Sequence, residues 1–154
     1  MNRFISVVSL SVFILCFFGC KTENYLETCP VSGTVKVDGQ PMAGVSIAFT
    51  TPASDGRMAS GVTNANGVYR LSAPGGKHDG GAEPGTYIPV FTKLEREVFE
   101  DLPAEEYEKK YGNRDPKETN LLPEKYSHAK TCGIDPVTVE KGKNNVFNFD
   151  LSTK

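Results

Sequence analysis

From residue 30 onward, short segments in which apolar and polar residues alternate recur along the chain. The first covers residues 31–37, where valine or glycine at every second position alternates with serine, threonine and lysine. Because successive side chains of a strand point to opposite faces, this period of two predicts a strand with one buried face. The same pattern predicts five further strands: 45–49, 57–63, 69–71, 137–139 and 147–151. An apolar run at 85–92 predicts one more, the fifth in chain order. With glycine and proline spread between them, the segments predict an all-β fold, a seven-stranded β-sandwich over residues 30–152.

The fifth expected strand is apolar on both faces. Tyr87, Pro89 and Phe91 would line one face, and Ile88 and Val90 the other. This composition predicts a strand that is covered on both sides. The proline has no N–H to donate to a neighbouring strand, so it favours an edge or a bulge.

After residue 93 the apolar period changes from two to about four. The residues that carry the new period are Leu94, Val98 and Leu102. This spacing is typical of a helix, and Pro103 either interrupts that helix or opens a second one. Acidic residues then precede basic ones, which suits a helix dipole, and Gly112 is a suitable helix end. We therefore expect a helical insertion over about 94–112, between strands five and six, with its apolar stripe packed on the outer face of strand five.

The N-terminus has the pattern of a bacterial lipoprotein signal peptide. An uncharged apolar run at 4–18 follows Arg3 and ends at Gly19-Cys20. As a helix the run would be roughly 22 Å long, short of the ~30 Å of a bilayer core. We expect residues 1–19 to be removed and Cys20 to become a lipidated N-terminus, with residues 20–29 as a tether. Because the two phenylalanines before Gly19 depart from the usual signal, an uncleaved anchor and a plain secretory signal are the alternatives.

All three interpretations of the N-terminus export the domain, and the charge of the chain then bears on its partners. The formal net charge is −2, or −3 once Arg3 is removed with the leader. This mild charge does not point to nucleic acid as a partner. The predicted partners are the membrane, through lipid on Cys20, and an envelope protein or a carbohydrate. Lys21 directly after the cysteine favours the outer membrane or periplasmic face.

Four cysteines have separate expected roles. Cys16 would leave with the leader and Cys20 would carry lipid, which leaves Cys29 and Cys132 as an even pair in an oxidising compartment. A disulfide between them would close a loop of about 100 residues and contribute up to about 4–5 kcal/mol. The alternative is two separate buried thiols. No metal-ligand spacing is present, so we expect no metal site.

Several turn and strand motifs, taken in order, resemble one known family. They are 31–45 (VSGTVKVDGQPMAGV), 63–71 (TNANGVYRL) and 84–87 (PGTY). This order is similar to carboxypeptidase regulatory-like domains. The later segments 122–126, 131–134 and 142–151 resemble small exported lipoproteins of planctomycetes and related bacteria.

The resemblance implies a transthyretin-like, Ig-like seven-stranded sandwich with a non-catalytic accessory, stabilising or binding role. The hydrolase activity in the family name belongs to a different, neighbouring domain. Two residues depart from the family pattern. Pro89 stands where a β-branched residue is usual, and Cys132 stands where the related lipoproteins tend to have serine.

Candidate chemistry in the sequence is sparse. There is no nucleophile elbow, zinc-protease motif or phosphate loop. His78 lies in the glycine-rich segment 73–84 and His128 follows Ser127, and neither neighbourhood predicts a rigid catalytic site. The residues 64–67 (NANG) predict a turn, because a calcium-binding loop would need several carboxylates. We expect no enzyme activity and no cofactor.

One aromatic set is a candidate contact surface for protein or carbohydrate: Tyr107, Tyr111 and Tyr126. Core packing accounts for these rings equally well. The sequence therefore predicts a lipid-anchored, exported, non-catalytic binding or structural module of the cell envelope. The alternatives are a small hydrolytic or carbohydrate-active protein that uses the insertion and the glycine-rich segment, and an accessory subunit of a larger envelope complex.

Overall fold

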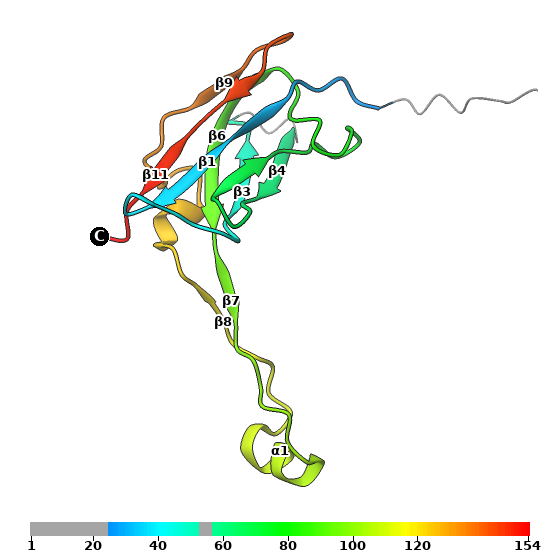
Figure 1. Cartoon of the computed structure of the whole chain (residues 1–154), viewed down its shortest axis with the longest axis vertical. Helices are drawn as coiled ribbons and strands as arrows, with labels where there is room; N and C mark the ends of the chain where they lie inside the picture. The colour runs from blue at the N-terminus through cyan, green and yellow to red at the C-terminus, as the bar shows by residue number, and fades with distance from the viewer. Residues whose placement is uncertain (1–24, 53–56) are drawn as a thin grey trace, which may run out of the picture.

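A computed structural model describes residues 25–52 and 57–154. Within this part the chain is mostly strands, eleven in all, with one short α-helix, so the all-β prediction is confirmed. The strands form a body from which one long insertion projects (Figure 1). The expected signal peptide and lipidated Cys20 lie outside the described residues, as does the first half of the expected tether, 20–24.

The first sheet is built around β1 (Val31–Val37). On one side β5 (Val68–Arg70) and β2 (Gln40–Pro41) pair with it antiparallel. On the other side β10 (Asn145–Val146) and β11 (Phe149–Leu151) pair with it in parallel. The N-terminal and C-terminal parts of the body are therefore held together by direct strand pairing.

The second sheet has the order β4-β3-β6-β9, and every pair in it is antiparallel. Its strands are β4 (Met58–Val62), β3 (Ser46–Thr50), β6 (Gly85–Thr92) and β9 (Val137–Val139). The range of β6 is the one the sequence predicts. Pro89 pairs with Phe49 of β3, but it lies beyond the part of β6 that β9 covers, which is 85–87. On that side β6 is unpaired at the proline, as expected.

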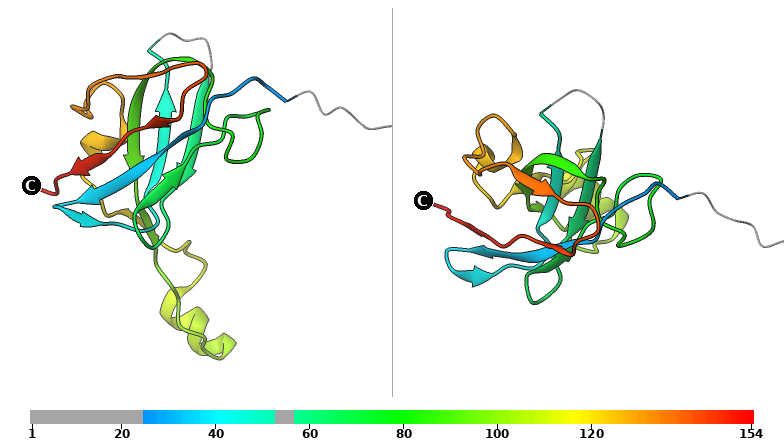
Figure 2. Two further views of the ribbon diagram at one scale, coloured as in Figure 1. Left: turned by 45° about the horizontal axis from the view of Figure 1, so that its top comes forward. Right: turned by 90° about the horizontal axis from the view of Figure 1, so that it is seen from above.

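The two larger sheets face each other across an aromatic core (Figure 2). The ring of Phe149 on β11 lies 5.0 Å from Phe91 and 6.4 Å from Phe49 of the opposite sheet, centroid to centroid. Tyr69 on β5 stacks on the same ring at 6.4 Å. Along β1, β3 and β6 alternate residues are buried, as the period of two predicts.

The last predicted strand, 147–151, is interrupted in the structure. β10 ends at Val146 and β11 begins at Phe149. Between them, the side-chain Oδ1 of Asn148 accepts hydrogen bonds from the Thr34 N–H at 3.0 Å and the Thr34 hydroxyl at 2.8 Å. The Asn148 side chain thus takes the place of a backbone carbonyl in the pairing with β1. The sequence predicted one strand over 147–151, and the structure has two short strands with a break between them, so the predicted count of seven strands is wrong.

The insertion also differs from the prediction of a helix over 94–112. β7 (Leu94–Arg96) pairs antiparallel with β8 (Glu118–Asn120), and the helix α1 (Ala104–Tyr111) lies between them. We call residues 94–120 the arm. It runs away from the body instead of lying on β6 (Figure 1). The expected packing of the stripe on β6 is therefore wrong, and Val98 is 90% exposed.

The ends of α1 follow the sequence signals. The helix begins directly after Pro103, so the proline opens a helix and does not interrupt one. Glu105 and Glu106 lie in its first turn, and it ends at Gly112, whose N–H bonds to the Glu108 carbonyl. A short 3-10 helix, η1 (Glu124–Ser127), takes the place beside β6 that the insertion was expected to fill.

The expected bridge between Cys29 and Cys132 is not formed in the structure, and both are buried free thiols. Cys29 pairs through its backbone with Ala82. The Cys132 thiol donates to the Ala129 carbonyl at 3.5 Å. The two sulfurs therefore have separate local environments, which is the alternative that the sequence left open.

Candidate contact surface

The tip of the arm has a small aromatic cluster of its own. Phe99 and Tyr111 stack with ring centroids 4.3 Å apart, and Tyr107 lies 5.2 Å from Tyr111 and 5.9 Å from Phe99. The guanidinium of Arg114 covers Phe99 at 4.6 Å and Tyr111 at 5.4 Å. All three rings are half-buried. Stacking of this kind fixes the helix on the segment that leads into it.

A two-pronged ion pair closes the arm just below this cluster. Both Arg114 terminal nitrogens donate to the Glu97 carboxylate, at 2.7 and 2.8 Å, and the Lys117 N–H donates to it at 3.3 Å. The hydrogen bonds from Arg114, followed by that from Lys117, lower the pKa of Glu97 to about 2. The same pairing raises the pKa of Arg114. The carboxylate thereby joins the outgoing and returning segments of the arm.

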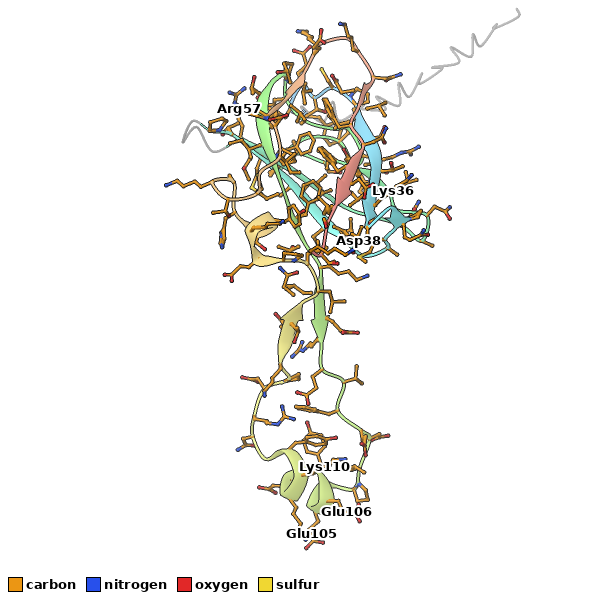
Figure 3. The ribbon with its side chains drawn as sticks, turned by 90° about the vertical axis from the view of Figure 1, so that its left-hand side faces the viewer. Lys36, Asp38, Arg57, Glu105, Glu106 and Lys110 are labelled. Carbon is orange, nitrogen blue, oxygen red and sulfur yellow. The ribbon has the colours of Figure 1, made fainter. Side chains whose placement is uncertain are left out.

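The outer surface of the arm is acidic. Residues 94–120 contain nine acidic and five basic residues, a net charge of −4, while the whole chain carries −2. Glu100 pairs with Lys110 at 2.8 Å, whereas Glu105 and Glu106 stand on the exposed end of the tip (Figure 3). Within the described part of the chain, seven of the nine make no ion pair: Glu95, Asp101, Glu105, Glu106, Glu108, Asp115 and Glu118.

The structure brings together two of the three tyrosines expected to form a contact surface. Tyr107 and Tyr111 share the tip cluster. Tyr126 lies in η1 on the body, is buried, and accepts a hydrogen bond from the Ser152 N–H at 3.0 Å. It is a packing residue, so the three do not make one surface.

Sequence reasoning missed two members of the tip cluster. Phe99 precedes the helix and is not one of the residues of the expected apolar period, so the pattern gave it no role. Arg114 follows the end of the helix. The available signal was the spacing of Tyr107 and Tyr111, four residues apart on one helix face. An exposed helix with two tyrosines on one face needs something to cover them.

The two histidines are exposed and belong to different parts of the body. His78 is 93% exposed and its Nδ1 lies 3.5 Å from the Asp79 carboxylate. His128 is 65% exposed and its Nε2 lies 3.9 Å from the Glu124 carboxylate. Neither pair is enclosed, and the arm lies far from the glycine-rich segment that carries His78 (Figure 1).

Within residues 25–52 and 57–154, no group of three or more histidine, cysteine or acidic side chains is placed to hold a metal ion. In the same residues, no helix has both the length and the apolar character needed to cross a bilayer. No family model, curated protein or solved structure matches the chain. The similarity to carboxypeptidase regulatory-like domains therefore stays a sequence-based prediction.

Proposed function

We propose that this protein is an exported, lipid-anchored, non-catalytic binding module of the cell envelope, and that the arm is its main contact element. The observation that carries the proposal is the arm itself. It leaves the body, buries none of its residues in the core, and still orders its tip through a ring cluster and the Glu97–Arg114 pair. Order at the end of a solvent-exposed extension is typical of a surface that meets a partner.

A non-catalytic role is supported by the polar groups of the body. Among the described residues, no buried side-chain nitrogen or oxygen lacks a hydrogen-bond partner. A buried polar group that is left unpaired can mark a catalytic or redox site. The hydrolytic alternative needed a rigid cleft that joins the insertion to the glycine-rich segment, and these lie at different ends of the body (Figure 1).

The position of the arm agrees with an anchor on the N-terminal side. The first described segment, which is blue in Figure 1, lies at the end of the body away from the arm. Lipid on Cys20 would therefore hold the body at the membrane and direct the tip outward. The two facing sheets also support the proposed transthyretin-like sandwich, although the strands are more numerous and more broken than that pattern predicts.

The exposed apolar side chains of the arm favour a protein partner, as in an accessory subunit of an envelope complex. Leu94 is 61% exposed and Val98 is 90% exposed. Neither residue contributes to the core of its own chain. Leu94 lies at the base of the arm, beside Asn120, and Val98 lies further along toward the charged tip. Exposed apolar side chains along a charged element fit a contact that has apolar points within a polar rim.

Site-specific crosslinking in intact envelopes tests this function. A photoreactive residue at Val98 should give defined adducts, whereas one at Val146, which is 59% exposed on the body, should not. An arm-deleted variant is feasible because the Leu121 N–H already bonds to the Lys93 carbonyl at 2.8 Å, so a short turn can join these residues. The variant should stay folded and membrane-bound but lose the partner. Equal adducts from Val98 and Val146 would refute the role of the arm.

The anchor is tested separately by Cys20→Ser. The wild-type protein should fractionate with membranes and have the mass of a lipidated chain that begins at residue 20. The variant should lose both properties. An unchanged mass and unchanged membrane retention in the variant would refute lipidation. The role of the arm would then still be judged by the crosslinking experiment.

A further inference from the structure

A polar groove lies in the body, where the two larger sheets meet. There β4 and β5 are joined by a single isolated bridge, in which the backbones of Ser60 and Ser72 exchange hydrogen bonds of 3.0 and 2.8 Å. The groove has a volume of about 660 Å³ and is open to solvent. Its polar lining comes from three segments: Ser60, Asn64, Arg70, Ser72, His78 and Asp79.

The floor of the groove is backbone, because β4 and β5 approach too closely for a side chain. A Cβ placed on Gly61 would lie 2.1 Å from the carbonyl oxygen of Arg70. Real Cβ atoms do not come so near to a backbone oxygen, so only glycine fits here. The absence of a side chain at Gly61, which the close approach of β4 and β5 requires, therefore leaves the floor of the groove open.

The glycine-rich wall of the groove is held in place by hydrogen bonds. The N–H of Gly76 bonds to the Ala73 carbonyl and that of Gly80 to the Lys77 carbonyl, each at 2.9 Å, which makes two successive turns. The Asp79 N–H donates to the Ser72 hydroxyl oxygen at 2.8 Å, and this bond connects the second turn to the residue that bridges β4. His78 and Asp79 are therefore presented by a folded segment.

Two of the polar residues in the groove, Arg70 and Asn64, have donor groups that stay without a partner among the described residues. Within the described residues, the Arg70 guanidinium makes no hydrogen bond or ion pair. Asn64 uses Oδ1 to accept from the N–H groups of Asn66 and Val68, at 2.9 and 3.1 Å, and its amide NH₂ stays available. Asp79 is the one carboxylate among the lining residues, and it faces His78.

We propose that this groove binds an acidic saccharide. The ligand carboxylate would meet the planar fork of Arg70, which matches a carboxylate with two parallel hydrogen bonds. Sugar hydroxyls would accept from the Asn64 amide and exchange hydrogen bonds with the Ser60 hydroxyl. The volume lies within the range of small-molecule sites, roughly 300–1,000 Å³. The inference goes beyond the proposed function, since it uses neither the arm nor the lipid.

The lining favours an acidic sugar over a neutral one. Sites for neutral sugars commonly place an aromatic ring against the apolar face of the sugar. Tyr69 is the one aromatic residue in the lining, and its ring is buried, with its hydroxyl donating to the Phe147 carbonyl at 2.9 Å. A free guanidinium with an amide beside it instead selects a charged group on a polyhydroxyl ligand.

Calorimetric titration of the full chain with trigalacturonate tests the proposal. Wild-type protein should bind trigalacturonate at least about tenfold more tightly than its fully methyl-esterified form, because the ester lacks the charge that Arg70 pairs with. Arg70→Gln should weaken trigalacturonate binding by about tenfold or more. Lys36→Gln removes an equal charge from an exposed position on β1 (Figure 3) and should leave binding unchanged.

Four results would overturn the proposal. They are no measurable heat at millimolar trigalacturonate, equal binding of the acid and its ester, equal binding by Arg70→Gln and wild type, and glutarate binding as tightly as trigalacturonate. The last would show a carboxylate site without sugar recognition. Arg70 is exposed, so thermal unfolding of Arg70→Gln should match wild type and show that a lost signal is a lost contact.

Discussion

Gly33 lies at the point where the central strand β1 is most tightly enclosed, and replacing it with alanine tests the account of the broken C-terminal strand. A Cβ at this position would lie 1.7 Å from the carbonyl oxygen of Phe147 and 3.0 Å from the ring of Tyr69. The backbone of Gly33 is not in the left-handed region, so the added methyl group causes a steric clash and no backbone strain. Either β1 or the segment between β10 and β11 must move.

The cost follows from what that movement breaks. Forcing a methyl into a filled site costs roughly 1–3 kcal/mol. Moving the Phe147 carbonyl also removes the partner of the buried Tyr69 hydroxyl, which donates to it at 2.9 Å, and this costs about 1–3 kcal/mol more. Gly33→Ala should therefore lower the free energy of unfolding by roughly 2–5 kcal/mol. For a domain of this size that is a fall in Tm of about 8–20 °C.

Thermal and urea unfolding followed by circular dichroism measure the effect, and two controls separate its parts. Tyr69→Phe removes the hydroxyl only and should cost about 1 kcal/mol. Gly142→Ala introduces a methyl where nothing lies within 4 Å but φ is +75°, so it should also cost only about 1 kcal/mol. A Gly33→Ala protein whose Tm is within about 3 °C of wild type would refute the close approach of β1 to Phe147.

Three further predictions address the arm, the closing turn and the thiols. The pKa of Glu97 is lowered to about 2 from an ordinary value of 4.5, so its pair with Arg114 should be complete above pH 4.5 and lost as the pH falls through about 2; side-chain NMR of the arginine should follow this change and be insensitive to pH in Glu97→Gln. Asn145→Ala should cost about 2 kcal/mol in urea unfolding, because the buried amide accepts from one backbone N–H at 2.9 Å and donates to three carbonyls, and a loss below about 0.5 kcal/mol would contradict this. Peptide mapping after thiol labelling of unreduced, denatured protein should find both Cys29 and Cys132 modified, and a linked peptide pair would contradict the structure.

The sequence predicted the longer strands of the body well because each has one face in the core. β6 spans the residues that its apolar pattern marks, and β1 alternates between buried and exposed positions as its valines require. The period of two could not reveal the break at Asn148. Phe147 and Phe149 continue the apolar alternation across the break, and Asn148 is the polar residue that the alternation expects between them. The break arises because the Oδ1 of Asn148 accepts the hydrogen bonds of Thr34, which the sequence pattern does not show.

The arm could not be predicted from apolar spacing because its strands bury nothing. β7 is fully exposed, and β8 consists of glutamate, threonine and asparagine. A ribbon with solvent on both faces has no hydrophobic period to detect. The charge order and the glycine of the helix, in contrast, act within one turn, so α1 and its end at Gly112 follow the sequence signals.

The same absence of burial separates the stability of the arm from that of the body. None of the buried core residues falls between Phe91 and Leu122. Opening the arm would therefore remove no core contact, and a lone two-stranded ribbon is at best marginally stable in water. What orders the tip is the ring cluster with Arg114 and the pair that this arginine makes with Glu97. Because folding of the body does not require these residues, we propose that their arrangement serves contact with a partner, which is why the crosslinker belongs at Val98.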